Sequence, residues 1–390
     1  MWTSRRLRLG LGGAAAGLAV VAAFVSPTPA SASTPTPPIS EHSLRSLLSV
    51  PLPGVTSLGT KLLLNGNKHV FTGVNAYELG TWWDVNPGCG SQVDNLDQLF
   101  SSLPPHSLVR FWAFQSLAVN KHTHTWDFTA LDRVFRAAAA HGDYLIATLS
   151  DQAGTCDGDY FHNDAWYKGG YKSLHESDGQ RRNITSFYSW VTKVVSRYRD
   201  NAGLGMWELV NEPEPSNCAS GYIGSACFGH NTCPSDATTS LRSFFDTMGA
   251  RLHSLDSRHL VASGLIGKGQ CGSAGTSYKY VSASKGVDVL TYHDYGDDVQ
   301  PPLPSDLVSD LTMAAALGKP LLTEEAGMAG APSSAACAHT LVGRATQVSA
   351  NIAAQMAAGV AGYLSWDWTP DANSGCSPDI GPNDPLLTAL

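Results

Sequence analysis

The stretch Leu204–Val210 (LGMWELV) is almost continuously apolar, and the polar residues Asn211 and Glu212 follow it directly. A run of this kind favours a β-strand that is buried on both faces and ends where the polar groups begin. Seven further bursts of the same character occur along the chain, at residues 70–75, 107–112, 144–149, 259–263, 287–292, 320–325 and 361–366.

Helix-compatible segments separate many of these bursts, most clearly at residues 131–140, 185–198, 241–255 and 346–358. Buried strands that alternate with helices predict a parallel sheet covered on its outside. Eight such units fit an α/β fold of the (β/α)₈ TIM-barrel type over residues 54–390, with long loops at the catalytic face, notably 151–183 and 213–240. The alternative, an open doubly wound sheet, is disfavoured because no Gly-x-Gly-x-x-Gly pattern follows the first strand.

The first residues have the pattern of an export signal. Arg5, Arg6 and Arg8 form a basic start, residues 9–25 are apolar, and residues 30–32 (ASA) form a small-residue cleavage site. This pattern predicts a signal peptide over residues 1–32, and a membrane anchor is the alternative. Residues 33–53 form a Pro/Ser-rich leader. We therefore expect a secreted, extracellular protein with no membrane attachment once the signal is removed.

The formal charge is −8 and charged residues make up 15% of the chain. A nucleic-acid-binding protein would show a basic excess, so we expect no nucleic-acid partner.

The cysteine count is even, which in an exported chain predicts four disulfides. Cys337 is expected to pair with Cys376, since the loops after the seventh and eighth strands are neighbours in a barrel. Cys271 is expected to join one of the three cysteines in the loop after strand four. The remaining pair would be Cys89–Cys156. The three candidates for Cys271 are Cys218, Cys227 and Cys233.

The carboxyl-terminal ends of barrel strands converge on one mouth. Two carboxylates that face each other across an aromatic-lined cleft are the requirement of glycoside hydrolysis, in which one holds a proton and the other stays ionised. No Gly-x-Ser-x-Gly elbow and no Cys/His/Asp cluster with metal spacing is present, so a serine esterase is disfavoured and neither a metal nor a cofactor is expected. The strand ends supply Asn75, Arg110, Trp112, Asn211, Glu212, His293, Tyr295, Glu325 and Trp366.

Two of these ends carry recognisable motifs. Residues 207–213 (WELVNEP) resemble the strand-four motif of the family 5 glycoside hydrolases, and residues 319–327 (KPLLTEEAG) resemble that family's strand-seven motif. The nucleophilic Glu of the family lies five residues after the Pro and two before the Gly, which selects Glu325 over Glu324. Alternation along a strand also predicts that these two neighbours point to opposite faces.

Other segments are most similar to the endo-β-mannanase branch of that family, namely residues 73–77 (GVNAY) and 109–114 (VRFWAF). His293 with Tyr295 matches the strand-six pair, and residues 362–366 match strand eight. Three departures are present: Ala326 replaces the usual aromatic residue, residues 293–296 (HDYG) lack the Pro-Asp often seen after the Tyr in mannanases, and residues 150–152 (SDQ) lack the Trp of mannanases.

The resemblance implies that Glu212 is the acid/base with a raised pKa and that Glu325 is the nucleophile, with carboxyl groups about 5–5.5 Å apart. The implied function is that of a secreted, monomeric, retaining hydrolase of β-linked polysaccharide, with β-1,4-mannan as the favoured substrate. A β-1,4-glucanase or related β-glycosidase and a non-catalytic glycan-binding barrel are the alternatives. The implied substrate-binding residues are Asn211, Arg110, His293, Tyr295, Trp366 and Trp112.

Overall fold

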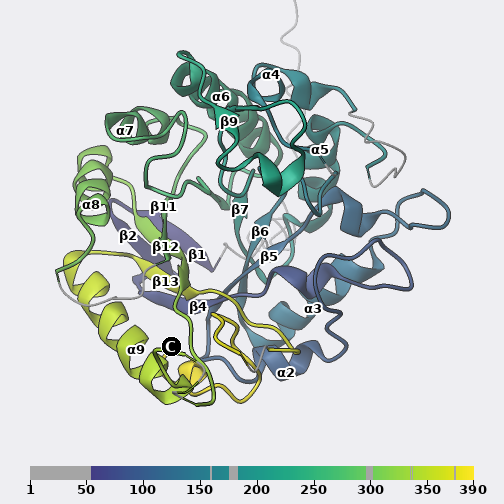
Figure 1. Cartoon of the computed structure of the whole chain (residues 1–390). Coiled ribbons are helices and arrows are strands. Elements are labelled where there is room, and N and C mark those ends of the chain that lie inside the picture. Colours follow the sequence, from purple (N-terminus) through teal and green to yellow (C-terminus); the bar gives the residue numbers. More distant parts are fainter. Residues whose placement is uncertain are drawn as a thin grey trace, which may run out of the picture. The chain divides into compact units, whose positions relative to one another are not determined.

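The computed structural model has an eight-stranded parallel sheet with the strand order β10-β7-β6-β5-β4-β13-β12-β11. A bridge between Ala262 and Val289 joins the two end strands, so the sheet curls into a barrel (Figure 1). Each predicted burst overlaps one strand, which confirms the predicted barrel. The strands are β4 (Phe71–Asn75), β5 (Leu108–Trp112), β6 (Tyr144–Thr148), β7 (Leu204–Glu208), β10 (Leu260–Ala262), β11 (Leu290–Tyr295), β12 (Leu321–Gly327) and β13 (Gly362–Ser365).

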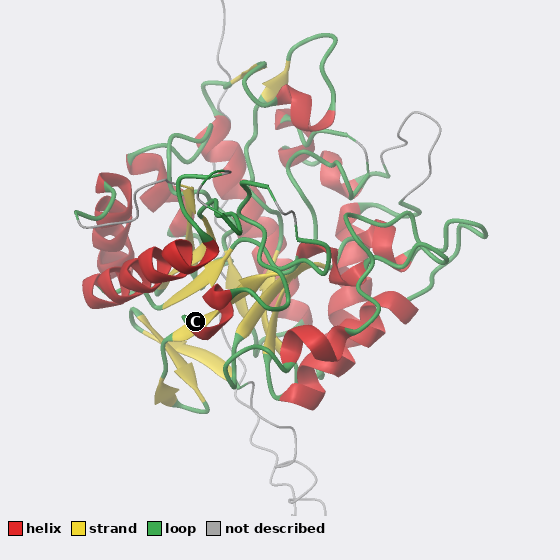
Figure 2. Ribbon diagram, turned by 60° about the horizontal axis from the view of Figure 1, so that its bottom comes forward, coloured by secondary structure: helices red, strands yellow, loops and turns green. Residues whose placement is uncertain are grey.

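Helices lie around the strands (Figure 2). In α5 the apolar residues recur at helical spacing and Trp190, Val191 and Val194 are fully buried, so one face of the helix packs on the sheet. The α-helices are α2 (Leu96–Phe100), α3 (Thr129–His141), α4 (Asp164–Tyr167), α5 (Phe187–Tyr198), α6 (Ala237–Leu255), α7 (Thr276–Ser282), α8 (Ser305–Leu317) and α9 (Leu341–Ala358). The 3₁₀ turns are η1 (Tyr77–Gly80), η2 (Gln115–Ala118), η3 (Gly170–Lys172), η4 (Gly224–Cys227) and η5 (Pro385–Thr388).

A small antiparallel sheet of β1 (Val55–Leu58), β2 (Lys61–Leu64) and β3 (Asn67–Lys68) precedes the barrel. Val55 and Leu62 are fully buried in one cluster with Phe71 and Leu108, the first residues of β4 and β5. This sheet therefore covers the amino-terminal end of the barrel, and the opposite end carries the open loops. The loop after β7 contains a second hairpin, made by β8 (Asn217–Cys218) and β9 (Asn231–Thr232).

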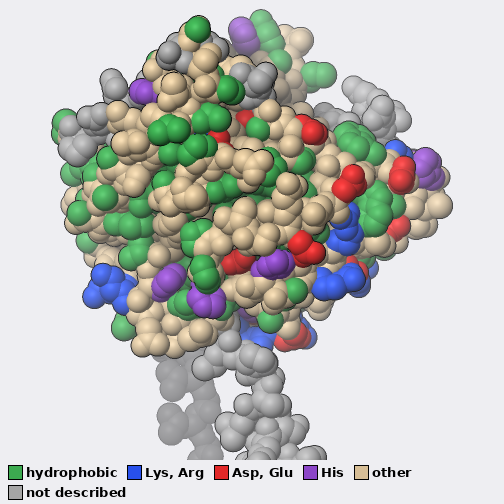
Figure 3. Space-filling model, turned by 90° about the horizontal axis from the view of Figure 1, so that it is seen from below, with side chains coloured by type: hydrophobic (Ala, Val, Ile, Leu, Met, Phe, Trp, Pro, Cys, Tyr) green, Lys and Arg blue, Asp and Glu red, His purple; other side chains and the backbone are tan. Residues whose placement is uncertain are grey.

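The structure describes residues 54–158, 160–174, 183–295, 302–333, 335, 337–372 and 375–390. The predicted signal peptide (1–32) and leader (33–53) lie outside this part of the chain. None of the helices within these ranges is both long enough and apolar enough to cross a membrane. On the face shown in Figure 3, charged side chains of both signs are scattered among neutral ones.

All eight cysteines form disulfides: Cys89–Cys156, Cys218–Cys227, Cys233–Cys271 and Cys337–Cys376. Each predicted pairing is confirmed, and Cys233 is the partner of Cys271. The Cys89–Cys156 and Cys233–Cys271 bonds each join two loops on the carboxyl-terminal side of the strands, so they restrain the mouth of the barrel.

We expect peptide mapping of the non-reduced protein to recover these four linkages. The Cys89→Ser/Cys156→Ser variant should lose about 2–4 kcal/mol of unfolding free energy, because the bond closes a loop with a sequence separation of 67 residues. Chemical denaturation measures this loss, and Cys218→Ser/Cys227→Ser, which opens a loop with a separation of only 9, is the matched control with a smaller loss. Free thiols at these positions in the native protein would contradict the pairing.

Candidate active site

Arg110 on β5 is completely buried and connects four strands of the barrel. Its Nε and Nη2 atoms donate to the two carboxylate oxygens of Glu208 at 3.0 and 2.7 Å. Nη1 donates to Asn75 Oδ1 at 3.0 Å and to Glu325 Oε1 at 2.6 Å, and Nη2 also donates to Asn211 Oδ1 at 2.6 Å. Burial opposes the charge, but the surrounding carboxylates hold the pKa of Arg110 well above its usual value. Arg110 is therefore a permanent cation at the centre of the site.

Glu325 lies on β12 and is 3% exposed. One carboxylate oxygen accepts the hydrogen bond from Arg110, and the other accepts one from the Tyr295 hydroxyl. Two donors from different strands thus fix the orientation of this carboxylate. A nucleophile needs such a fixed position relative to the atom that it attacks.

Glu212 follows β7 with a φ of 51°, in the left-handed region that residues other than glycine rarely adopt. Its backbone is held there by two hydrogen bonds, from its own amide to Gly264 O at 2.9 Å and from Gln270 Nε2 to its carbonyl at 2.8 Å. Its side chain is 23% exposed and accepts a hydrogen bond from His293 Nδ1 at 2.8 Å. A strained backbone that surrounding contacts maintain is typical of functional positions.

The carboxylates of Glu212 and Glu325 both approach His293 Nδ1, at 2.8 and 3.5 Å. One ligand atom from each of these three residues lies within 4.8 Å of the others. This proximity favours the short separation of a retaining pair over the roughly 6.5–9.5 Å of an inverting pair. It would also allow the three residues to share a cation. In this structure, Glu212 accepts a hydrogen bond from His293, and Glu325 accepts hydrogen bonds from Arg110 and Tyr295.

The protonation state of Glu212 in the free protein differs from the sequence-based expectation. Burial would raise the pKa of Glu212, but the hydrogen bond and charge of His293 and the charge of Arg110 hold it below its usual value. Burial would likewise lower the pKa of His293, but Glu325, Glu212 and Glu324 raise it to about 10. The expectation of a raised pKa for Glu212 is therefore wrong for the free protein, because the imidazolium beside it stabilises the carboxylate.

The expectation that Glu324 and Glu325 point to opposite faces is also wrong. In the register of β11 with β12, Tyr292 pairs with Thr323 and His293 pairs with Glu325, which leaves Glu324 as an extra residue in a bulge. The Glu324 carboxylate is fully buried, 3.7 Å from Arg110 Nε and 3.6 Å from His293 Nε2. The bulge thus turns both carboxylates of the pair toward the same two cations.

Sequence reasoning missed the roles of Glu208 and Glu324. Burial and the nearby Glu324 hold the pKa of Glu208 well above its usual value, against the opposing charge of Arg110. Burial would also raise the pKa of Glu324, but Arg110 and hydrogen bonds from His293 and Glu208 lower it. Each of these two carboxyl groups therefore influences the pKa of the other. The sequence signal that could have identified them is an acidic residue inside each of two strands that are otherwise apolar.

A cavity of about 350 Å³ opens on the side of β4, β5, β6 and β13. Trp366 stacks on Tyr77 with ring centroids 5.6 Å apart, which presents a flat aromatic surface to this cavity. Trp112 also lines it but is only 6% exposed, because Arg110 and Phe114 cover its ring faces. The contact between Trp112 and substrate stays a prediction, and only the small exposed part of the ring is accessible for it.

Asp151 was not among the predicted site residues, although it lies in the segment that lacks the mannanase Trp. Its Oδ1 accepts a hydrogen bond from Asn211 Nδ2 at 3.1 Å, and it lines the same cavity. Burial, with the charge of Glu212, raises the pKa of Asp151 to about 7. Because Asn211 also accepts from Arg110, its amide orientation is fixed on both sides.

Known proteins resemble the chain in both sequence and fold, although no family model matches it. It is 26% identical over 370 residues to a probable mannan endo-1,4-β-mannosidase A of Aspergillus oryzae, covering 84% of this chain and 82% of that protein. Its fold is similar to an endo-1,4-β-mannanase of Rhizomucor miehei (TM-score 0.60, 21% identity, 86% and 96% of the two chains). A family 5 glycoside hydrolase mannosidase of R. miehei gives a TM-score of 0.56 at 15% identity, with 87% and 95% covered. These similarities confirm the predicted resemblance to the family 5 glycoside hydrolases and their mannanase branch.

We expect Glu324→Gln to lower the pKa of His293 from about 10 by roughly one pH unit or more, because it removes a negative charge 3.6 Å from Nε2. The ordinary pKa of His is 6.5, so the ion pairs of His293 stabilise the fold fully below pH 6.5 and this stability is lost as pH rises through about 10. NMR titration of the His293 imidazole measures the change in its pKa. The signal of His293 is identified by its absence from the spectrum of His293→Gln. Asp143→Asn is the control: it removes a buried carboxyl just before β6 and should leave the pKa of His293 unaltered.

Proposed function

We propose that this protein is a secreted, monomeric endo-β-1,4-mannanase that cleaves its polysaccharide with retention of configuration. The observation that carries the proposal is the close pair of Glu212 and Glu325 at the mouth of the barrel, both in contact with His293 Nδ1. The sequence similarity to mannan endo-1,4-β-mannosidases supports mannan as the substrate. The four disulfides and the amino-terminal signal pattern support secretion.

In the first step, a Glu325 oxygen attacks the anomeric carbon while Glu212 donates its proton to the leaving oxygen, and the glycosidic bond breaks. In the second step, Glu212 takes a proton from water, and the resulting hydroxide displaces Glu325 and releases the sugar. Loss of the Glu325 charge in the intermediate removes a like charge from near Glu212 and favours its ionised, basic form. Before the first step Glu212 must gain a proton, and exclusion of water by bound sugar raises its pKa in that direction.

The neighbours of the pair suit a sugar at the cleaved bond. Asn211, held between Arg110 and Asp151, has an amide in place for the 2-hydroxyl. The indole of Trp366 offers a flat face for the apolar side of the ring. A hydrogen bond to the 2-hydroxyl can strengthen in the transition state and so raise kcat.

Separate glutamine variants test the two catalytic roles. Glu325→Gln should lower kcat by several orders of magnitude on every substrate. Glu212→Gln should lower it much less for nitrophenyl glycosides than for polymer, because a good leaving group needs little protonation. Circular dichroism checks that both variants are folded. Equal losses for Glu212→Gln on the two kinds of substrate would contradict its role as the acid.

The rates of hydrolysis of soluble β-1,4-mannan, β-1,4-glucan and xylan test which polysaccharide is the preferred substrate. The axial 2-hydroxyl of mannose and the equatorial one of glucose require different positions of Asn211, so we expect kcat/KM to be higher on mannan by about tenfold or more. Asp151, in the segment that lacks the mannanase Trp, is the departure from the mannanase pattern that contacts Asn211. A preference for glucan would reject the mannanase assignment and leave the two-glutamate mechanism in place. Inactivity on all three polymers would reject the proposal that the protein is a polysaccharide hydrolase.

A further inference from the structure

His293 meets a carboxylate at each of its two ring nitrogens. Nδ1 donates to Glu212 Oε1 at 2.8 Å, and Nε2 lies 3.6 Å from an oxygen of Glu324. The imidazole is 1% exposed and the Glu324 carboxylate is fully buried, whereas the Glu212 side chain is partly exposed. These three groups therefore form a row that runs from the mouth of the barrel into its interior.

The proposed mechanism leaves the role of Glu324 open. It requires a proton on Glu212 at the start of the first step, although the free protein keeps Glu212 ionised. The partner of one ring nitrogen of a histidine decides which nitrogen carries the hydrogen of the neutral ring. A carboxylate that faces Nε2 stabilises a hydrogen at that nitrogen. The hydrogen on Nδ1 is then the one that His293 can give up.

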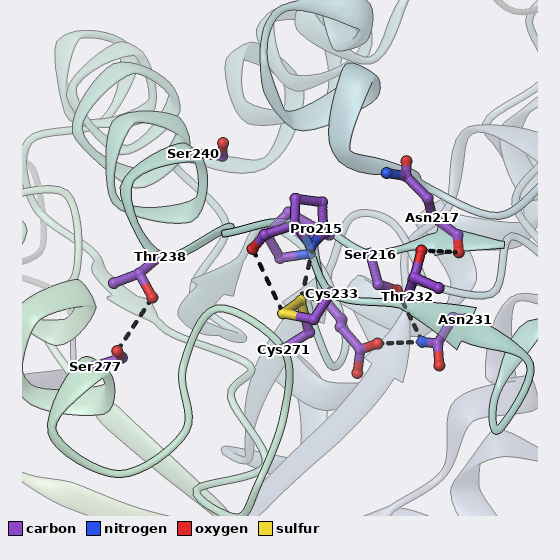
Figure 4. Close-up of a disulfide and its surroundings, with 12 residues drawn as sticks. Pro215, Ser216, Asn217, Asn231, Thr232, Cys233, Thr238, Ser240, Cys271 and Ser277 are labelled. Atoms are coloured by element: carbon purple, nitrogen blue, oxygen red, sulfur yellow. Dashed lines mark hydrogen bonds between the residues drawn. A yellow bond between two sulfur atoms is a disulfide. The ribbon is translucent and has the colours of Figure 1, made fainter. Parts of the chain in front are cut away.

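The distance between Glu212 and His293 is fixed from both sides. His293 lies inside strand β11, which pairs with β12. The Glu212 carbonyl accepts a hydrogen bond from Gln270, and the next residue, Cys271, is bonded to Cys233 in the loop after β7 (Figure 4). A hydrogen can therefore pass between Nδ1 and the Glu212 carboxylate without a movement of the backbone.

We propose that His293 supplies the proton of Glu212 and that Glu324 is a positioning residue that acts through His293, an inference that rests on the proposed function. When bound sugar excludes water from Glu212, the Nδ1–H bond breaks and an O–H bond forms on Glu212. His293 becomes neutral and keeps its other hydrogen on Nε2, toward Glu324. The transfer neutralises two opposite charges, which the loss of water favours.

The protons balance over the two steps. In the first step Glu212 passes the hydrogen to the leaving oxygen, while the neutral ring of His293 keeps the hydrogen on Nε2. In the second step water gives a hydrogen to Glu212 and hydroxide to the sugar, and the bond between Glu325 and the sugar breaks. When the product leaves, the hydrogen returns from Glu212 to Nδ1, and both groups regain their charges.

Charged groups from several elements act on the titration of His293. Glu325 and Glu324 of β12 and Glu212 after β7 approach its ring nitrogens. Burial lowers the pKa of His293, but these three carboxylates raise it to about 10. Further groups that act on these carboxylates are Arg110 of β5, Glu208 of β7, Tyr295 of β11 and Asp151 after β6. Of the three carboxylates, Glu324 alone takes no part in bond breaking, so it can be changed without removing a catalytic group.

The pH dependence of kcat/KM on β-1,4-mannohexaose tests the source of the proton, because it reports the titration of groups in the free enzyme. If His293 supplies the proton, the active form holds one proton on the pair of His293 and Glu212. The rate then falls only at alkaline pH, where His293 titrates. If solvent supplies the proton while His293 stays charged, the active form holds two protons. The rate then falls above about pH 4–5, where a free Glu titrates, and this result would overturn the proposal.

Substitutions of Glu324 test its role in the unmodified remainder of the site. Glu324→Gln should move the alkaline limb of the profile to lower pH by about one unit or more, because the negative charge that faces Nε2 is lost. Glu324→Asp keeps the charge and should restore most of this shift. Asp294→Asn is the matched control, since it removes the buried carboxylate next to His293 in sequence, which accepts from Gln355 of α9 instead. The control should leave the alkaline limb where it is.

A nitrophenyl β-1,4-mannobioside separates proton supply from other effects, because its leaving group needs little protonation. On this substrate, kcat/KM of Glu324→Gln should stay within about threefold of the unmodified protein across the alkaline range. A loss on mannohexaose that is equal at every pH would show a structural role alone and contradict the proposal. Circular dichroism checks that the variants fold. Inactivity of the unmodified protein on both substrates would instead reject the proposed function.

A second measurement needs no variant of Glu324. Nitrogen NMR of the histidine-labelled protein is recorded free and bound to a β-1,4-mannotetraose in which sulfur replaces the bridging oxygens. We expect the His293 ring to change from doubly protonated in the free protein to neutral in the complex, with its hydrogen on Nε2. A ring that keeps both hydrogens in the complex would rule out His293 as the source of the proton.

Discussion

The buried charge of Arg110 is the constraint on which the site depends. A guanidinium without solvent is stable only when carboxylates and amide oxygens surround it, and removing one partner of a buried ion pair costs about 3–5 kcal/mol. Arg110 meets this requirement with side chains from β4, β7, β12 and the turn after β7. The same contacts fix Asn211 and Glu325. The geometry required for catalysis is therefore also the geometry that neutralises a buried cation.

The carboxylates around this cation lie close to one another. Glu208 and Glu324 are fully buried beside Arg110, and Glu212 and Glu325 both contact His293 Nδ1. A change of charge at one of them alters the electrostatic environment of the others. In the proposed mechanism, formation of a bond at Glu325 is such a change. The low pKa of Glu212 in the free protein is consistent with a second step that requires a base.

Much of this arrangement could be predicted from the sequence, and the failures have specific causes. Apolar bursts identified all eight barrel strands, since strands buried on both faces leave a continuous signal. The site residues lay at strand ends, and the structure brings Asn211, Glu212, His293 and Glu325 together.

The orientation of Glu324 could not be predicted, because a bulge breaks the alternation on which the argument relied. The pKa of Glu212 depends on a contact with His293, 81 residues away in sequence, which no local pattern encodes. The sheet of β1, β2 and β3 was missed because its strands are short.

The two ends of the barrel are built differently, and this difference determines where chemistry can occur. At the amino-terminal end, Val55 and Leu62 bury apolar surface against Phe71 and Leu108, the first residues of β4 and β5. At the other end, the Cys89–Cys156 disulfide borders the cavity that Trp366 lines, and the Cys233–Cys271 disulfide links the loops after β7 and β10. Loops are ordinarily the least rigid part of a barrel. Covalent links on both sides of the Glu pair hold the long loops at a constant distance from it. The proposed cleavage requires this, because one bond of the polymer must be placed between the two carboxylates.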